Sequence, residues 1–255
     1  MALRNGLLVH GPTHWAVAVR TRDGSVEVAS GPKPRLRGPV TELPGLRGVV
    51  RIAEAFALLP LIKRQVPEVR LPFEDGRVLA AMLASSVLSA GVRHGERSPG
   101  REGIVALLGM APAAFALKDS ELAAWHGVEH KAIGGYEQGT DASEAAKEHD
   151  RCGSNLVAPM LAANVAGAAL LRRVVERPGP LANAAVSLAA AGAAVEVFAW
   201  AERHADTRAA RAIRRPGFEL QRAMGTREPD EAQLEVGRAA LAEILRVEGA
   251  SADAA

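Results

Sequence analysis

Two histidines and a glutamate form a His-x-x-Glu-His motif near the middle of this 255-residue chain. His126 and His130 are four residues apart, so on a helix their imidazoles lie on one face, at a separation that one metal ion can bridge. Glu129 stands beside them, where its carboxylate can accept a proton from water on that metal. Histidine nitrogens with a carboxylate suit zinc, and also non-haem iron or manganese. The motif therefore predicts a divalent metal site, with zinc as the first candidate. The plain alternative is a surface helix whose two histidines bind nothing.

Two further donors follow downstream with His-x-x-Cys spacing. His149 offers another nitrogen and Cys152 offers a thiolate, so either could complete the set of ligands. Cys152 is the single cysteine of the chain, which excludes an internal disulfide and fits a reducing compartment. Its role stays open among metal ligand, nucleophile and small buried side chain.

Glu196 is the last candidate ligand. The His-x-x-Glu-His string is the inverted-zincin pattern, in which two histidines bind zinc and the glutamate activates water, and a later helix supplies a further glutamate. Glu196 stands alone in the apolar run 189–201, where a charge is costly unless it is paired, protonated or coordinating. The competing interpretation is a helix-end residue close to a membrane interface.

A helix must carry the histidine pair. We expect it to begin after Asp119 or Ser120, since either residue can cap it, and to end near Gly139. Gly127 lies inside this helix and weakens it by about 1 kcal/mol relative to alanine. The same glycine would permit the close approach of another backbone.

The chain before this helix is expected to hold a small β-hairpin and then helices. Strands with alternating polarity are expected at 14–19 and 25–29 around the turn Asp23-Gly24, followed by a loop over 31–44 and a helix over 49–66 that Pro60 kinks or ends. After the histidine region, a final helix is expected over 229–247, with Leu234, Leu241, Ile244 and Leu245 buried.

Four apolar segments cover 78–92, 103–117, 152–171 and 178–201. The last two are long enough to span a bilayer, whereas the first two are short for one. Because alanine favours insertion only weakly, buried helices of a soluble protein remain an alternative. An even number of spans would leave both termini and the histidine region on one side of the membrane. These parts hold 25 of the 31 Lys and Arg residues, and such an excess of positive charge favours the cytoplasmic side. The arginines of the short loops argue the other way, so the topology stays open.

These elements predict a mainly α fold, an Ala-rich helical bundle embedded in a membrane, with a small N-terminal β-hairpin. We divide it into the hairpin and loop (1–45), a helical metal-site domain (46–248) and a disordered tail (249–255). The 31 basic and 29 acidic residues give no electrostatic case for nucleic-acid binding. The expected partners are membrane lipid, an unknown substrate and a second copy of the chain in a homo-oligomer.

Several ordered motifs resemble the YqhQ-like family, a bacterial family of unknown function. They are Gly11-Pro12-Thr13-His14-Trp15, His126-Gly127-Val128-Glu129-His130-Lys131, Tyr136-Glu137-Gln138-Gly139, His149-Asp150-Arg151-Cys152-Gly153-Ser154 and Pro216-Gly217-Phe218-Glu219-Leu220-Gln221. The resemblance implies a multi-pass membrane protein labelled a predicted metal-dependent enzyme, without an assigned reaction. It carries the site over to His126, Glu129, His130, His149, Cys152 and Glu196. One departure is Asn5, which stands where family members have a glutamate.

Three functions follow from these residues. The first is a metal-dependent enzyme that uses metal-activated water for hydrolysis, with Glu129 as general base. The second is a non-catalytic multi-pass membrane protein whose metal site is structural and serves assembly or partner binding. The third is a soluble helical domain whose histidines bind nothing, located in the cytoplasm.

Overall fold

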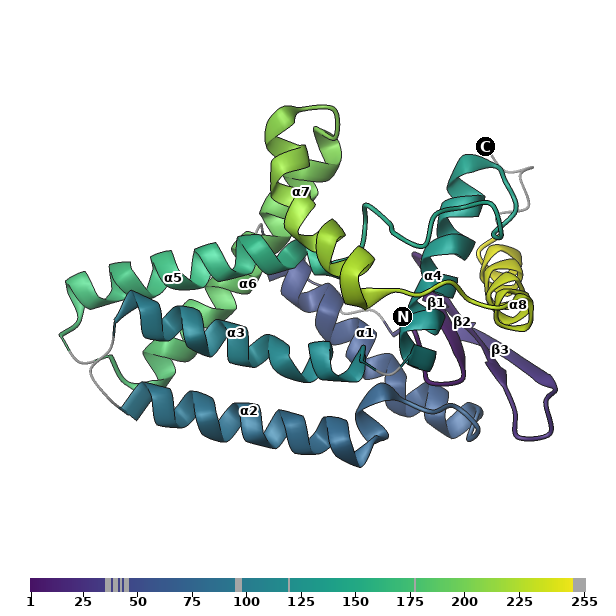
Figure 1. Ribbon diagram of the computed structural model, residues 1–255, viewed down its shortest axis with the longest axis horizontal. Helices are drawn as coiled ribbons and strands as arrows, with labels where there is room; N and C mark the ends of the chain where they lie inside the picture. The colour runs from purple at the N-terminus through teal and green to yellow at the C-terminus, as the bar shows by residue number, and fades with distance from the viewer. Residues whose placement is uncertain are drawn as a thin grey trace.

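The computed structural model describes residues 1–34, 38, 41, 43, 46–94, 98–118, 120–176 and 178–249. The tail expected after Gly249, the cap expected at Asp119 and much of the loop expected over 31–44 lie outside these residues. The fold is mainly helical with a small N-terminal sheet, as predicted. It is elongated, with the sheet at one end and long apolar helices at the other (Figure 1).

The expected hairpin is confirmed and gains a third strand. Strands β2 (His14–Arg20) and β3 (Val26–Pro32) pair antiparallel around the turn at Gly24, and β1 (Gly6–His10) pairs with the other edge of β2. The pattern did not reveal β1 because Leu7 and Leu8 are both buried, so polarity does not alternate along it.

Helices cover both faces of the sheet. Trp15, Val17 and Val19 of β2 pack with side chains from the second half of α1 (Leu46–Gln65), including Leu58 and Ile62. Pro60 lies inside α1, which continues to Gln65. The opposite face carries small side chains such as Ala18, so the helices α4 (Ser120–Gln138) and α8 (Glu231–Val247) pack closely there.

α8 begins at Glu231, close to the start predicted at residue 229. Asp230 caps it, accepting a hydrogen bond from the Gln233 backbone N–H while the Gln233 side chain accepts one from the Asp230 backbone N–H. Leu234 and Ile244 are buried, and Leu241 and Leu245 are partly buried. This helix thereby closes the sheet face on which α4 also lies.

The four apolar segments form helices that leave the sheet end as two antiparallel pairs. They are α2 (Gly76–His94), α3 (Pro99–Ala116), α5 (Val157–Val174) and α6 (Pro180–Arg203). α2 packs on α3, α5 packs on α6, and contacts between α3 and α5 join the pairs (Figure 1). Residues 153–174 and 181–203 are long and apolar enough to cross a membrane, as expected. Within the 18-residue apolar stretch of each helix, only 11% and 22% of the residues are buried in the protein.

Large apolar side chains are exposed along these helices. Leu83 and Val87 of α2 are 62% and 70% exposed. Val174, at the end of α5, and Leu181, at the start of α6, are 83% and 87% exposed. Large apolar side chains exposed in this number are typical of a membrane or protein interface.

A short basic helix returns the chain to the sheet. α7 (Arg208–Leu220) starts at Thr207, whose hydroxyl caps it, and carries several arginines. It runs into the π-helical turn η4 (Gln221–Gly225), and the chain then crosses α4 on its way to α8. On the other side of the same region, the short 3-10 turn η3 (Gly153–Leu156) opens α5. η3, η4 and α4 meet where the sheet end joins the apolar helices.

Candidate metal centre

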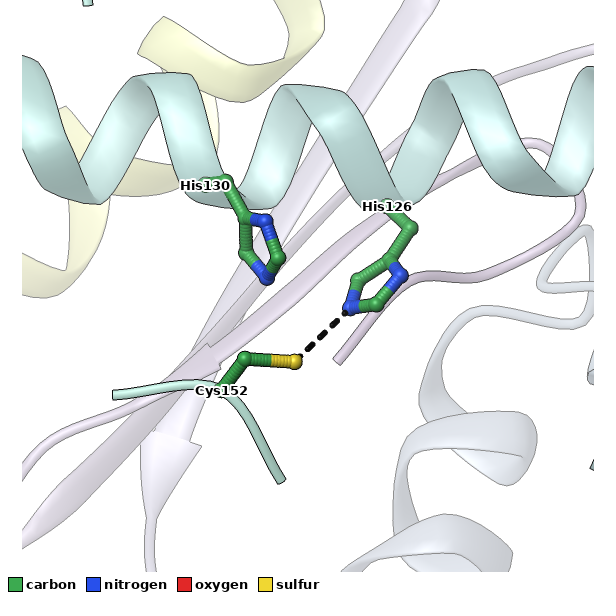
Figure 2. A group of neighbouring side chains, drawn as sticks. All are labelled: His126, His130 and Cys152. Carbon is green, nitrogen blue, oxygen red and sulfur yellow. Dashed lines mark hydrogen bonds between the residues drawn. The ribbon is translucent and has the colours of Figure 1, made fainter. Parts of the chain in front are cut away.

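The two motif histidines project from one face of α4. Trp125, Val128 and Ala132 of this helix are buried against the sheet and α8, which turns His126 and His130 toward the loop before α5. Their ring centroids are 4.3 Å apart, and both rings point toward Cys152 (Figure 2). The expected placement of the pair on one helix face is therefore realised.

Backbone carbonyls fix both imidazoles. His126 Nδ1 lies 2.7 Å from the carbonyl oxygen of Gly225, and His130 Nδ1 lies 2.6 Å from that of Lys147. A carbonyl only accepts hydrogen bonds, so each Nδ1 carries a proton and donates it, and each Nε2 is the ring nitrogen left for another partner. His130 Nε2 is buried and has no hydrogen-bond partner among the described residues. Such an arrangement is usual for metal-binding histidines, whose other nitrogen donates to a carbonyl or carboxylate.

Cys152 faces both Nε2 atoms from the loop that precedes η3. Its sulfur lies 3.5 Å from His126 Nε2 and accepts a hydrogen bond from the Ser154 backbone N–H. Burial raises the pKa of the thiol, but interactions with His126 and His130 outweigh it and lower the pKa to about 5. The side chain is thus a thiolate at neutral pH, the form that binds metals and attacks carbonyls.

The three side chains fit a divalent metal ion. One donor atom each from His126, His130 and Cys152 lie within 4.8 Å of one another. Zinc bound to sulfur and imidazole holds neighbouring donors roughly 3.5 Å apart, which is the spacing of the Cys152 and His126 atoms. Two nitrogens and a thiolate suit zinc, and three protein ligands match the number found in catalytic zinc sites.

Gly127 makes the His126 contact possible. A Cβ at this position would lie 2.2 Å from the carbonyl oxygen of Arg227, whose N–H donates to the carbonyl of Ala123. The segment after η4 therefore crosses directly over α4, as the glycine allows. This crossing brings the carbonyl of Gly225 to His126.

Gln221 fixes the loop that carries Cys152, and the chemical motifs of the sequence did not single it out. Its side chain is 1% exposed and accepts from the His149 backbone N–H while donating to the His149 carbonyl and the Ser154 hydroxyl. The one signal is its place at the end of the family-like stretch 216–221. A buried, fully bonded amide of this kind fixes one local geometry.

Lys131 anchors the same loop nearer its start. The side chain is almost fully buried, and Nζ donates to the carbonyl of Ala145 at 2.8 Å and lies 3.1 Å from a carboxylate oxygen of Glu228. Together with the His130–Lys147 contact, this holds the loop alongside α4. The position of Cys152 is therefore set by several polar contacts between α4, η4 and the loop.

Glu129 lies next to the three-residue group but outside it. Its Oε1 accepts a 2.8 Å hydrogen bond from the amino group of Met1. Burial raises the pKa of Glu129, yet the charges of that amine, His126 and His130 lower it to about 2, so the side chain is a carboxylate. The rings are thus close enough for electrostatic coupling to Glu129.

His149 and Glu196 are the two predicted ligands that the structure places outside the group. The His149 ring is tilted against that of His130, with the two ring centroids 5.7 Å apart. Its Nε2, however, lies 3.1 Å from a Glu137 carboxylate oxygen, and its Nδ1 accepts from the Arg151 N–H. Glu196, on α6, receives two hydrogen bonds from the Arg47 guanidinium of α1. The charge of Glu196 is therefore paired with that of Arg47. Pairing is one of the conditions under which we expect an acidic residue in an apolar run.

Asn5, where family members have a glutamate, is a buried structural residue here. Its amide nitrogen donates to the carbonyls of Arg20 and Glu68, and its oxygen accepts from the Arg70 N–H. It links the edge of the sheet to the segment after α1.

Comparison with known proteins gives one match. The family described as Protein of unknown function (DUF1385) matches residues 116–247, which is more than half of the chain and includes the whole site. No curated protein and no solved structure matches the chain.

Proposed function

The chain belongs to the YqhQ-like family of unknown function, DUF1385, and from its site we propose that it is a metal-dependent hydrolase held at a membrane. The observation that carries the proposal is the convergence of one donor atom each from His126, His130 and Cys152 within 4.8 Å. The buried, unpartnered nitrogen of His130 supports it, because such an atom costs free energy unless a ligand satisfies it.

Each side chain has a task in this proposal. His126 and His130 bind through Nε2, since Nδ1 of each ring donates to the carbonyl of Gly225 or Lys147, and Cys152 binds as a thiolate. A divalent ion held there, zinc first and iron or manganese as alternatives, supplies a Lewis acid that makes water a nucleophile at neutral pH. Glu129 accepts the proton of the attacking water and passes it to the leaving group. The Met1 amine that now binds this carboxylate has to yield its place to water.

The first test is the metal content of the purified protein by elemental mass spectrometry. We expect about one zinc or iron ion per chain in the wild type and its loss in the His126→Ala/His130→Ala double variant. His204→Ala is the control, because this histidine lies at the C-terminal end of α6, stacked on Trp200 and outside the group. A wild type without metal after incubation with zinc or ferrous iron would rule the proposal out.

Glu129→Gln separates binding from catalysis. The amide preserves the shape of the side chain but cannot take a proton, so this variant should keep its metal and lose turnover. Full activity in Glu129→Gln would remove this residue from the mechanism. The substrate for this measurement comes from a screen of esters, amides and phosphoesters with the metal-loaded protein.

A thiol mechanism is the second candidate, favoured by the 3.5 Å contact between Cys152 Sγ and His126 Nε2 and by the lowered pKa of the thiol. Cys152 would attack a carbonyl itself, with His126 moving the proton. Activity that survives chelation and is lost on alkylation with iodoacetamide would favour this mechanism over the metal site. Loss of activity on chelation, with recovery on adding zinc, would favour the metal.

A structural metal site remains the non-catalytic alternative. Structural zinc sites are closed by four protein ligands. Within the part of the chain that the structure describes, three donors converge, and His149 and Glu196 are engaged by Glu137 and Arg47. This count supports a catalytic role, because an open coordination position is what a substrate or water needs.

The membrane placement is part of the proposal. α5 and α6 would cross the bilayer with α2 and α3 beside them, since the exposed apolar side chains of all four then meet lipid. The sheet, α4 and α8 would lie on one side, which we assign to the cytoplasm. The arginines of α7, including Arg208, Arg211 and Arg215, lie at the same end and support this orientation. The expected homo-oligomer is tested by light scattering of the detergent-solubilised protein.

A further inference from the structure

A long cavity leads away from the His126–Cys152 pair. It has a volume of about 680 Å³, within the range of sites for small molecules. His126 and Cys152 line it at the sheet end, and Arg93 and Glu102 line it at the far end of the apolar helices. Its walls are the facing sides of α3 and α5, and most of its lining side chains are apolar.

Small residues on α3 create this space. Ala106, Gly109 and Ala113 recur at helical spacing on the face toward the cavity, opposite Met160 and Leu161 of α5. A Cβ added at Gly109 would meet no atom within 4 Å, so the helices do not close over it. From Glu102 to Leu117 the cavity follows α3 for roughly 22 Å at 1.5 Å per residue.

A charged pair lines the far end of the cavity. Arg93 of α2 lies 3.7 Å from the carboxylate of Glu102, which is 9% exposed. Between this pair and His126, most of the lining is apolar. An occupant that suits this lining has a polar group at His126 and Cys152 and an apolar body of limited length.

We propose that this cavity holds the hydrocarbon chain of an acyl lipid, with the acyl carbonyl at His126 and Cys152 and the chain end toward Arg93 and Glu102. The length of the cavity supports this occupant. The acyl chains of one leaflet fill half of the ~30 Å hydrocarbon core, and the cavity, at roughly 22 Å, is longer than that half. The exposed apolar faces of α3 and α5, with Leu107 57% and Leu170 59% exposed, place a source of such lipid beside it.

This assignment rests on the proposed hydrolase and names its substrate class. Water adds to the acyl carbon, the bond from that carbon to the leaving oxygen or nitrogen breaks, and the leaving group takes the proton. The products are a fatty acid and an alcohol or amine, without any oxidant or reductant.

The test uses full-length protein in phosphatidylcholine nanodiscs and two palmitic acid probes. One probe carries its photoreactive diazirine near the carboxyl group and the other near the methyl end, and labelled peptides are mapped by mass spectrometry. We expect the first to label residues 152–157 and the second to label residues 102–109. Reversed labelling, or labelling spread evenly over the exposed faces of α2 and α6, would overturn the assignment.

Gly109→Leu should fill the cavity and reduce labelling about tenfold, since a loss of roughly 1.4 kcal/mol of binding has that effect. Gly91→Leu is the matched control, because Gly91 also has open space around its Cβ position but lies on α2 outside the lining. Ala113→Leu repeats the obstruction at a second position, and thermal unfolding checks that each variant is folded. Unchanged labelling in both filled variants would also overturn the assignment.

His126→Ala keeps this test independent of the metal. The variant should lose metal and keep the labelling pattern. If the wild type is labelled as expected but holds no metal, the hydrolase fails and the chain site stands. If it holds metal but the labelling is unspecific, the lipid substrate fails and the metal centre stands.

Discussion

The imidazole of His126 donates a 2.7 Å hydrogen bond to the carbonyl oxygen of Gly225, 99 residues later in the chain. This bond fixes the ring so that its other nitrogen faces Cys152. The carbonyl is free to accept because Gly225 is the last residue of the π-helical turn, and the last carbonyls of a helix have no partner within it. The candidate metal centre therefore depends on backbone crossing at Gly127 as much as on its own side chains.

Gly127→Ala should weaken both folding and metal binding. The added methyl would meet the Arg227 carbonyl at 2.2 Å, so the segment after η4 must move away from α4. We expect a loss of about 2 kcal/mol or more of unfolding free energy and weaker zinc binding, as the Gly225 contact is pulled apart. Urea unfolding and zinc titration measure the two effects. Gly91→Ala, where the new Cβ has open space, should be neutral or stabilising, and equal behaviour of the two variants would contradict the close crossing.

Gln221→Leu should release the loop that carries Cys152. The buried backbone groups of His149 and the Ser154 hydroxyl lose their partners, at a cost of about 1–3 kcal/mol. Because the loop positions the thiolate, the alkylation rate of Cys152 in the metal-free protein should change as well. Gln65→Leu on the exposed face of α1 is the control. A Gln221→Leu protein with wild-type stability and reactivity would show that the amide does not hold the loop.

Glu243 should contribute to stability in a pH-dependent way. Hydrogen bonds from Arg246 and from Ser30 of β3 lower the pKa of Glu243 to about 2. A carboxyl whose pKa is lower in the folded state stabilises the protein above its unfolded pKa of 4.5, and this contribution is lost as the pH falls toward 2. The difference in melting temperature between wild type and Glu243→Gln should therefore be largest above pH 5 and shrink below it.

The control for this pH series is Glu235→Gln. Glu235 is an exposed carboxylate of the same helix whose distance to Arg20 is 3.7 Å. The melting temperature of the Glu235→Gln variant should follow that of the wild type at every pH of the series. A Glu243→Gln difference that stays constant from pH 7 to pH 3 would show that the carboxylate charge is not what joins β3 to α8.

Single cysteines should report the topology. In a Cys152→Ala background, Ser98→Cys places a thiol at the start of α3, at the far end of the apolar helices, and Ser25→Cys places one in the turn between β2 and β3. With the sheet in the cytoplasm, a membrane-impermeant maleimide should label Ser98→Cys in intact cells and Ser25→Cys only after permeabilisation. Labelling of both in intact cells, or of neither, would contradict two helical pairs that cross and return.

The periodicity of the sequence predicted two kinds of element: those that are buried on one side only, and those that are apolar along a long run of residues. The β2–β3 hairpin follows from alternation, α8 from Pro229 and the apolar spacing after it, and α5 and α6 from unbroken apolar runs. Strand β1 was not predicted because it is short and buried on both faces. The end of α1 was open in the sequence because a proline can either kink or end a helix, and the packing of α1 on the sheet decides that it continues.

The sequence by itself determined that His126 and His130 share one face of a helix, because a spacing of four residues and the 3.6-residue turn permit nothing else. It also determined that the apolar segments 152–171 and 178–201 are long enough to cross a membrane, because length and apolarity suffice. Only the tertiary structure decided that Cys152 joins the histidines while His149 and Glu196 pair elsewhere. Those distances depend on how the loop before η3 and the turn η4 are held against α4, through contacts between residues far apart in the chain that no local pattern encodes.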